Sequence, residues 1–268
     1  MRPNPGVRDC YAAWVEELSG DPDETFLLHG IRNGFDIVDA TATPVPVEVN
    51  NNSSARPGST LYDQATKQVL SEIECGNYIV CEDKPAIVSP LSAIAKPDGG
   101  IRLIHDGSQP EGTSMNDYAT LDTHHRFQTV DDAAKHMYPG YYMAKVDLKA
   151  AYRSVPISQH SQNFTGLKWT FDTTTIYLRD SKLPFGSRLA PGIFHRLTQS
   201  VRRMMTRKFP DVSTIVYPDD FLIMSSCQEA LAGLIALHVL RRLGLQISWH
   251  IKGHRCLPMS SILRDPIG

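Results

Sequence analysis

Three aspartates carry the clearest chemical signal in the sequence. Asp219 and Asp220 follow Pro218 between two β-rich runs, which places them at the tip of an expected hairpin. Asp147 stands in an alternating segment that predicts a strand. Carboxylate oxygens are the ligands that Mg²⁺ prefers, and two such ions can stabilise the attacking and leaving oxygens of phosphoryl transfer. The three residues are therefore candidate catalytic groups and metal ligands.

The acidic pair also has a simpler explanation. Proline and aspartate are favoured turn formers, so Pro218, Asp219 and Asp220 could serve the turn alone. The residue types by themselves leave both explanations open.

The hydrophobic pattern predicts the elements that would position these acids. In the alternating segment 141–148, Asp147 shares a face with Met143 and Lys145. Around it we expect helices and strands in the order helix, strand, helix, hairpin, helix, strand, which predicts an α+β sheet covered on one face by helices. The segments are a helix at 129–138, the strand at 141–148, a helix at 189–209, hairpin strands at 214–217 and 221–225, a helix from a capping box at 226–229 to Gly244, and a strand at 245–249.

The first part of the chain has weaker patterning. Apolar spacing predicts helices at 11–18 and 61–75, and strands at 87–95 and 101–105 are joined by a glycine-containing hairpin. Residues 41–60 have the composition of a linker.

Composition limits the class of protein only loosely. The 268 residues are 41% hydrophobic with a net charge of −2, so the global charge does not favour a nucleic-acid binder. The five cysteines show no zinc-binding spacing. There is no apolar run of membrane-spanning length and no signal peptide, so we expect an intracellular protein of the cytoplasm or nucleus with no membrane partner.

Four motifs stand in order between about residues 87 and 252. They are Lys96-Pro97-Asp98-Gly99 through Arg102-Leu103-Ile104-His105-Asp106, Asp147-Leu148-Lys149-Ala150-Ala151-Tyr152, Leu183-Pro184-Phe185-Gly186-Ser187 through Ala190-Pro191-Gly192-Ile193-Phe194, and Tyr217-Pro218-Asp219-Asp220. In their order and gaps they resemble the motifs of reverse transcriptases, and the style is closest to retrotransposon enzymes.

The resemblance implies the α+β right-hand fold of a polymerase with interleaved fingers and palm. The fingers would comprise residues 60–118 and 158–183, and the palm residues 119–157 and 184–257. Residues 1–59 would be an N-terminal extension and linker, and residues 258–268 a C-terminal tail. No thumb or ribonuclease H domain is recognisable, so we expect weak duplex binding.

The resemblance also implies a reaction, which is template-directed addition of deoxynucleotides to a primer 3′-hydroxyl. The partners would be an RNA or DNA template with its primer and deoxynucleoside triphosphates. Asp147 and Asp219 would hold two Mg²⁺ or Mn²⁺ ions, with Asp220 close by. Tyr152 would stack under the incoming sugar and favour deoxynucleotides, although it could simply be a half-buried aromatic residue that starts a helix.

Four further residues would contact the nucleotide if the resemblance holds. Lys96 and Arg102 would grip the triphosphate, which suits a lysine point charge and an arginine fork. Phe185 and Gly186 would lie beside the nucleotide and the template base. An ordinary solvated hairpin and a plain loop before a helix are the simpler explanations. Lys252 is a loose match to a lysine near the pyrophosphate.

Basic residues gather in one region of the sequence. Seven lie between Lys182 and Lys208 with no acid among them. Arg196, Arg203 and Arg207 share one helical face, which could follow a phosphate backbone or could simply be solvated.

Pro218 departs from the family pattern, in which the resemblance implies a positive φ at this position. Proline fixes φ near −65°, so we expect it to reshape or strain the turn. Pro218 and the lack of a recognisable thumb suggest one alternative to an active enzyme, an inactive, truncated retroelement relic. The basic helix face suggests another, a nucleic-acid-binding module that retains the palm.

Overall fold

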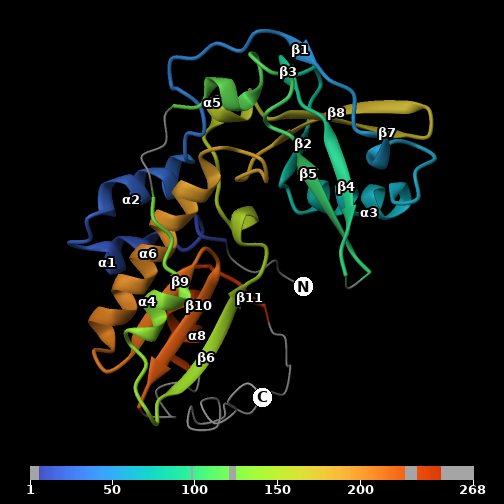
Figure 1. The fold of residues 1–268 in the computed structure, drawn as a ribbon. Helices are drawn as coiled ribbons and strands as arrows, with labels where there is room; N and C mark the ends of the chain where they lie inside the picture. The colour runs from blue at the N-terminus through green and yellow to red at the C-terminus, as the bar shows by residue number, and fades with distance from the viewer. Residues whose placement is uncertain (1–5, 98, 121–124, 227–233, 249–268) are drawn as a thin grey trace. The chain divides into compact units, whose positions relative to one another are not determined.

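The computed structural model describes residues 6–97, 99–120, 125–226 and 234–248, and it contains both helices and sheets. The chain divides into two compact units that interleave along the sequence (Figure 1). Unit 1 is Met1–Leu28, His124–Ser154 and Phe194–Gly268, and unit 2 is His29–Thr123 and Val155–Ile193. The α+β class predicted from the sequence is therefore confirmed.

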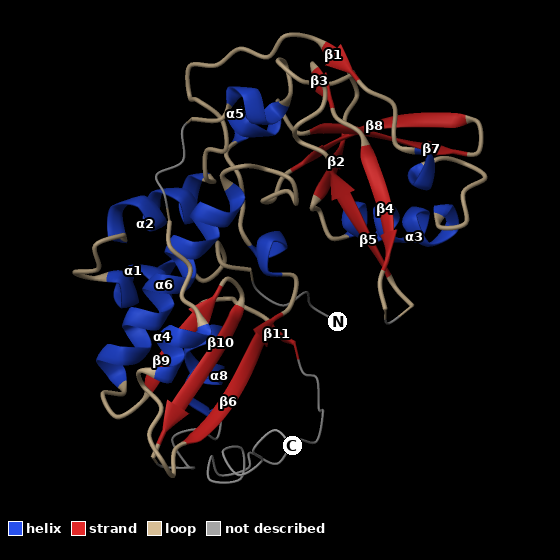
Figure 2. Cartoon of the chain, viewed as in Figure 1, coloured by secondary structure: helices blue, strands red, loops and turns tan. Residues whose placement is uncertain are grey.

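Unit 1 contains a four-stranded antiparallel sheet with the order β11-β6-β10-β9 (Figure 2). The alternating segment forms the long strand β6, and the expected hairpin forms β9 and β10. The bounds are β6 (Tyr142–Leu148), β9 (Ser213–Tyr217), β10 (Asp220–Ser225) and β11 (Ile247–Ser248).

Helices contact both faces of this sheet. Met205 of α6 accepts a hydrogen bond from the Thr214 hydroxyl, whereas Ala133 of α4 packs against Ile215 and Met224. Thr214 and Ile215 are consecutive residues of β9 and therefore point to opposite faces. The prediction that helices cover one face only is thus wrong, because the short helix α4 lies on the other. The helices with residues in this unit are α1 (Tyr11–Leu18), part of α2 (Glu24–Asn33), α4 (Val130–Ala134), most of α6 (Ala190–Lys208) and α8 (Leu234–Arg242), with the 3₁₀ turn η3 (Ala151–Ser154).

Unit 2 is built on a five-stranded sheet with the order β1-β3-β7-β8-β2 and a separate hairpin, β4-β5. Its elements are β1 (Val47–Glu48), η1 (Ser53–Ala55), α3 (Tyr62–Glu74), β2 (Tyr78–Val80), β3 (Ile87–Val88), β4 (Leu91–Ala95), β5 (Ile101–His105), η2 (Met115–Tyr118), α5 (Gln159–Gln162), β7 (Gly166–Phe171) and β8 (Thr174–Asp180).

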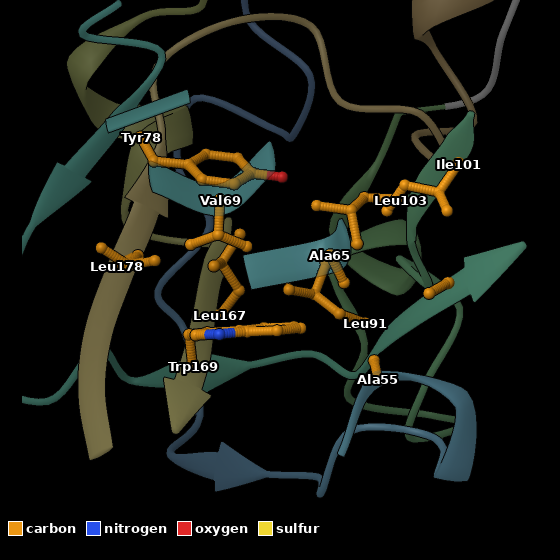
Figure 3. Packing of buried hydrophobic residues seen from close by; sticks show 11 residues of the cluster. Ala55, Ala65, Val69, Tyr78, Leu91, Ile101, Leu103, Leu167, Trp169 and Leu178 are labelled. Atoms are coloured by element: carbon orange, nitrogen blue, oxygen red, sulfur yellow. The ribbon is translucent and has the colours of Figure 1, made fainter. Parts of the chain in front are cut away.

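Helix α3 fills the core of unit 2, as its apolar spacing predicts. Ala65 and Val69 are fully buried in one cluster with Trp169 and Leu178 of the sheet and Leu103 of the hairpin (Figure 3). Residues that share a helical face thereby hold the β4-β5 hairpin against the sheet.

The structure also differs from the predicted elements. The strand expected at 87–95 is broken at Ser89-Pro90 into β3 and β4, because proline has no N–H to continue a ladder. The helix expected at 11–18 is confirmed as α1, and the segments expected to be an extension and linker also contain α2 and β1. The β7-β8 hairpin and α5 were not predicted.

Some predicted features fall outside the described residues: Asp98 in the hairpin turn, residues 227–229 of the expected capping box, Trp249, Lys252 and the tail at 258–268. Across the described part of the chain, no helix is both long enough and apolar enough to cross a membrane.

Candidate active site

The three aspartates meet at one end of the unit 1 sheet. Strands β6 and β10 are neighbours, and their register sets Asp147 directly opposite Asp220. Asp219 lies in the turn just before Asp220, and its carbonyl oxygen accepts a hydrogen bond from the Leu148 N–H at 3.3 Å. Acids that are more than seventy residues apart in sequence therefore form one group, named here the carboxylate cluster (Asp147, Asp219 and Asp220).

The turn that carries Asp219 is tight despite its proline. Tyr217 pairs with Asp220, so only Pro218 and Asp219 lie between the two strands. The non-glycine residues with positive φ in the described part of the chain are Ala150 and Asp172, so neither residue of this turn is among them. The hairpin therefore keeps its register without the positive φ that the resemblance implies at Pro218.

One cation faces the carboxylate cluster from within the sheet. The Lys145 ammonium lies 2.8 Å from Oδ2 of Asp220, and this hydrogen bond raises the pKa of Lys145. Burial raises the pKa of Asp147, and so does the negative charge of Asp220. Burial also raises the pKa of Asp219, with the charges of Asp220 and Asp147 adding to it. The cluster therefore carries more negative charge than Lys145 balances.

The donor set suits Mg²⁺ or Mn²⁺, since all three side chains offer hard oxygen ligands. A divalent cation would relieve the mutual repulsion between the carboxylates. The positive charge of Lys145 relieves part of this repulsion. Among the described residues, no group of three or more His, Cys, Asp or Glu side chains is already arranged to hold a metal ion.

Tyr152 lies in η3, close enough to Asp219 for that charge to affect it. Burial raises the pKa of Tyr152 to about 12, and the charge of Asp219 adds to the effect. Its ring packs on Phe194 of α6, with the ring centroids 5.2 Å apart. The chain enters η3 through Ala150, whose φ of 50° turns it sharply after β6. Tyr152 is therefore a protonated, half-buried aromatic residue of the same unit as the aspartates.

The other four candidates belong to unit 2. Lys96 follows the end of β4 and Arg102 lies on β5, and both side chains are exposed. Phe185, which is 40% exposed, and Gly186 lie in the loop before α6. Gly186 has a φ of +113°, and a Cβ there would lie 2.0 Å from the carbonyl oxygen of His105. Only glycine allows this loop to approach the end of β5 so closely.

The arginines on the basic face of α6 already form ion pairs with two aspartates. Arg203 donates two hydrogen bonds to Asp21, at 2.8 and 2.6 Å, and another to Asp23 at 2.8 Å. Arg196 also binds Asp23, at 2.7 Å, and Arg207 lies 3.6 Å from Asp21. The expectation that these arginines could follow a phosphate backbone is therefore wrong. They form an arginine cluster (Arg196, Arg203 and Arg207 with Asp21 and Asp23), and sequence analysis missed it because the acids lie about 180 residues away.

Two residues of the site escaped the sequence analysis. Lys145 shares a face with Asp147 in the alternating pattern, so its place beside the acids could have been predicted. Gln128 gave no signal. Its Oε1 accepts hydrogen bonds from the Val216 N–H at 3.0 Å and from Gln199 Nε2 at 3.2 Å, and it thereby links α6 to β9 just before the acidic turn.

Carboxylates that converge from adjacent strands are typical of enzymes that transfer phosphoryl groups with metal ions. A family model described as reverse transcriptase (RNA-dependent DNA polymerase) matches residues 93–252. This match covers more than half of the chain, and the chain belongs to the reverse transcriptase family. No curated protein matches the chain significantly.

Proposed function

We propose that this chain is an RNA-directed DNA polymerase that adds deoxynucleotides to a primer 3′-hydroxyl as it copies a template. The observation that carries the proposal is the convergence of Asp147, Asp219 and Asp220 within a chain of this family. Raised carboxyl pKa values at this cluster support it, because functional sites often hold charges that the fold leaves partly unbalanced. A retrotransposon origin fits the motifs.

In this proposal, Asp147 and Asp219 hold two Mg²⁺ or Mn²⁺ ions, with Asp220 beside them. Bound ions of this kind supply charge that stabilises both the attacking 3′-oxygen and the departing pyrophosphate. Lys145 neutralises Asp220 when no divalent cation is bound. Tyr152, protonated at any physiological pH, offers its ring to the sugar of the incoming nucleotide.

The palm proposed at residues 119–157 and 184–257 would lie mostly in unit 1, and the fingers proposed at residues 60–118 and 158–183 would lie in unit 2. The exposed Lys96 and Arg102 of the β4-β5 hairpin would hold the triphosphate, since an ammonium and a guanidinium together suit several phosphate oxygens. The exposed ring of Phe185 and the close backbone of Gly186 would border the nucleotide and the template base.

The turn at Pro218 favours one alternative, a chain that folds but does not polymerise. A change in the turn that moves a catalytic carboxylate by about 1 Å can cost on the order of 10²-fold in rate. The other alternative, a nucleic-acid-binding module, was based on the basic face of α6. It is less well supported because arginines of that face form ion pairs with Asp21 and Asp23.

The test is incorporation of a labelled deoxynucleotide on an RNA-templated primer with Mg²⁺ or Mn²⁺. The native chain is compared with Asp219→Ala and Pro218→Leu. We expect incorporation by the native chain and none by Asp219→Ala. Incorporation by Pro218→Leu alone would instead identify the turn as the defect of an inactive copy, and label appearing equally with Asp219→Ala would refute the proposed role of the carboxylates.

A further inference from the structure

A buried asparagine of unit 2 joins three segments of the chain that meet at the end of β5. Asn116 lies in η2 and is only 5% exposed. Its Nδ2 donates hydrogen bonds to the Gly186 carbonyl at 2.8 Å and to the Ser108 hydroxyl at 2.9 Å. Its Oδ1 accepts a hydrogen bond from the Arg188 N–H at 2.8 Å. Both amide hydrogens and the carbonyl oxygen are therefore used, which is what a buried amide requires.

The segments that Asn116 joins also touch through their backbones. A Cβ at Gly107 would lie 2.9 Å from the carbonyl oxygen of Gly186, and the Asn116 N–H donates to the Gly107 carbonyl at 2.8 Å. Together with the close approach of Gly186 to His105, this leaves no room for a side chain between the loop and the hairpin end. The position of the loop is thus fixed closely as long as Asn116 keeps its hydrogen bonds.

The loop itself has little regular structure to hold it. Residues 183–188 form no helix or strand, and the two backbone hydrogen bonds of Ser187 are long: its N–H donates to the Pro184 carbonyl at 3.3 Å, and its carbonyl accepts from the Ala190 N–H at 3.4 Å. The two bonds from Asn116 to Gly186 and Arg188 bracket Ser187 on both sides. These two hydrogen bonds hold the loop in place, as backbone hydrogen bonds do within a helix or strand.

We infer that Asn116 is a positioning residue that sets the loop of Phe185 and Gly186 against the β4-β5 hairpin for nucleotide binding. This inference rests on the proposed function, in which that loop and Arg102 of the hairpin contact the incoming deoxynucleotide. Asn116 does not touch the nucleotide in this account. Its loss should therefore weaken binding of the deoxynucleotide more than it slows the chemical step.

The test compares Asn116→Asp with a matched variant, Asn51→Asp. Asn51 is a second buried asparagine of unit 2, 7% exposed, whose side chain accepts from the Leu91 N–H at 3.0 Å and donates to the Lys168 carbonyl at 2.9 Å. Each substitution keeps the side-chain size and replaces a hydrogen-bond donor with an acceptor that faces a carbonyl oxygen. A role in stability alone predicts the same behaviour for both variants.

We expect Asn116→Asp to raise the KM for the deoxynucleotide about tenfold while kcat stays within about threefold, since a small displacement of the loop weakens each contact it makes. Trypsin cleavage after the exposed Arg188 should accelerate about tenfold, because the loop opens more readily. Asn51→Asp should change neither. Ser108→Ala, which removes one of the three bonds, is a milder variant in case Asn116→Asp does not fold.

Equal changes in KM for Asn116→Asp and Asn51→Asp, or no change in either, would overturn the inference. If the native chain does not incorporate nucleotides at all, the proposed function fails, and proteolysis alone decides the role of Asn116. In that case, faster cleavage at Arg188 in Asn116→Asp than in Asn51→Asp supports its hold on the loop, and equal cleavage rejects it.

Discussion

The carboxylate cluster and the arginine cluster both bring acids and bases together in unit 1, but they balance charge differently. Burial alone would raise the pKa of Asp21, yet hydrogen bonds from Arg203 and the charges of Arg203 and Arg207 outweigh it and lower that pKa. At the carboxylate cluster, burial and repulsion raise the pKa of Asp147, and Lys145 compensates only in part. Charge at Asp21 therefore stabilises the fold, whereas charge at Asp147 opposes it. This difference fits a structural role for the arginine cluster and the catalytic role proposed for the carboxylate cluster.

The largest difference should appear in catalysis. Asp147→Asn keeps the size of the side chain but removes a charged ligand, so nucleotide incorporation should fall at least about 10³-fold. The variant should still fold, because the fold does not depend on this charge. Rates from primer extension, with circular dichroism as a check on folding, measure this effect. Retained incorporation would place the catalytic metal ligands elsewhere.

The next largest effect concerns stability. The Asp21 side chain is fully buried, at 0% exposed, and Asp21→Asn would remove its charge while Arg203 keeps its ion pair with Asp23. Because Asp23 remains and Arg203 is partly exposed, we expect a loss of at most about 3 kcal/mol, the lower end for breaking a buried ion pair, and urea denaturation would measure it. Asp211→Asn, at an exposed acid of the same unit, is the control and should cost little. Similar losses for both variants would mean that the arginine cluster does not hold the fold together.

The two clusters should respond oppositely to pH. The lowered pKa of Asp21 means that its contribution to stability is present above the ordinary carboxyl value of 3.8 and is lost as the pH falls below it. The raised pKa of Asp147 means that its ionisation costs stability as the pH rises above 3.8. At neutral pH, Asp21→Asn should therefore be less stable than the native chain and Asp147→Asn slightly more stable. Thermal unfolding near pH 7 and near pH 3 tests this, and both differences should shrink at the lower pH.

A smaller effect is expected at the edge of the sheet. Gln128→Met would leave the buried N–H of Val216 without its acceptor, which costs about 1–2 kcal/mol. The hairpin would then be held less firmly, and incorporation should fall by about tenfold. Gln199→Met removes the neighbouring glutamine but keeps the bond between Gln128 and Val216, so it should have the smaller effect on rate. The reverse order would show that Gln128 does not position the hairpin.

Local patterns predicted the elements that carry the carboxylate cluster. Alternation gave the face that Asp147 shares with Lys145, and the hairpin around Asp219 formed despite Pro218. The arginine cluster could not be predicted, because its acids and bases lie far apart in sequence and only packing brings them together. The same holds for Asn116, whose bonds reach the Gly186 loop about 70 residues away. The sequence pattern predicts local structure and shows where charged residues gather. It does not show which of those charges form ion pairs in the folded protein.

Stability as a function of added divalent cation tests the distinction between the clusters most directly. Thermal unfolding of the native chain, Asp147→Asn and Asp21→Asn would be followed as Mn²⁺ or Mg²⁺ is raised to millimolar concentration. A cation that binds only the folded state stabilises it, and the gain rises with the logarithm of the cation concentration once that concentration exceeds the Kd. We expect the native chain and Asp21→Asn to gain similar stability, whereas Asp147→Asn, slightly more stable at the start, should gain much less. Equal gains in all three proteins, or a gain lost only in Asp21→Asn, would show that the carboxylate cluster does not bind the cation.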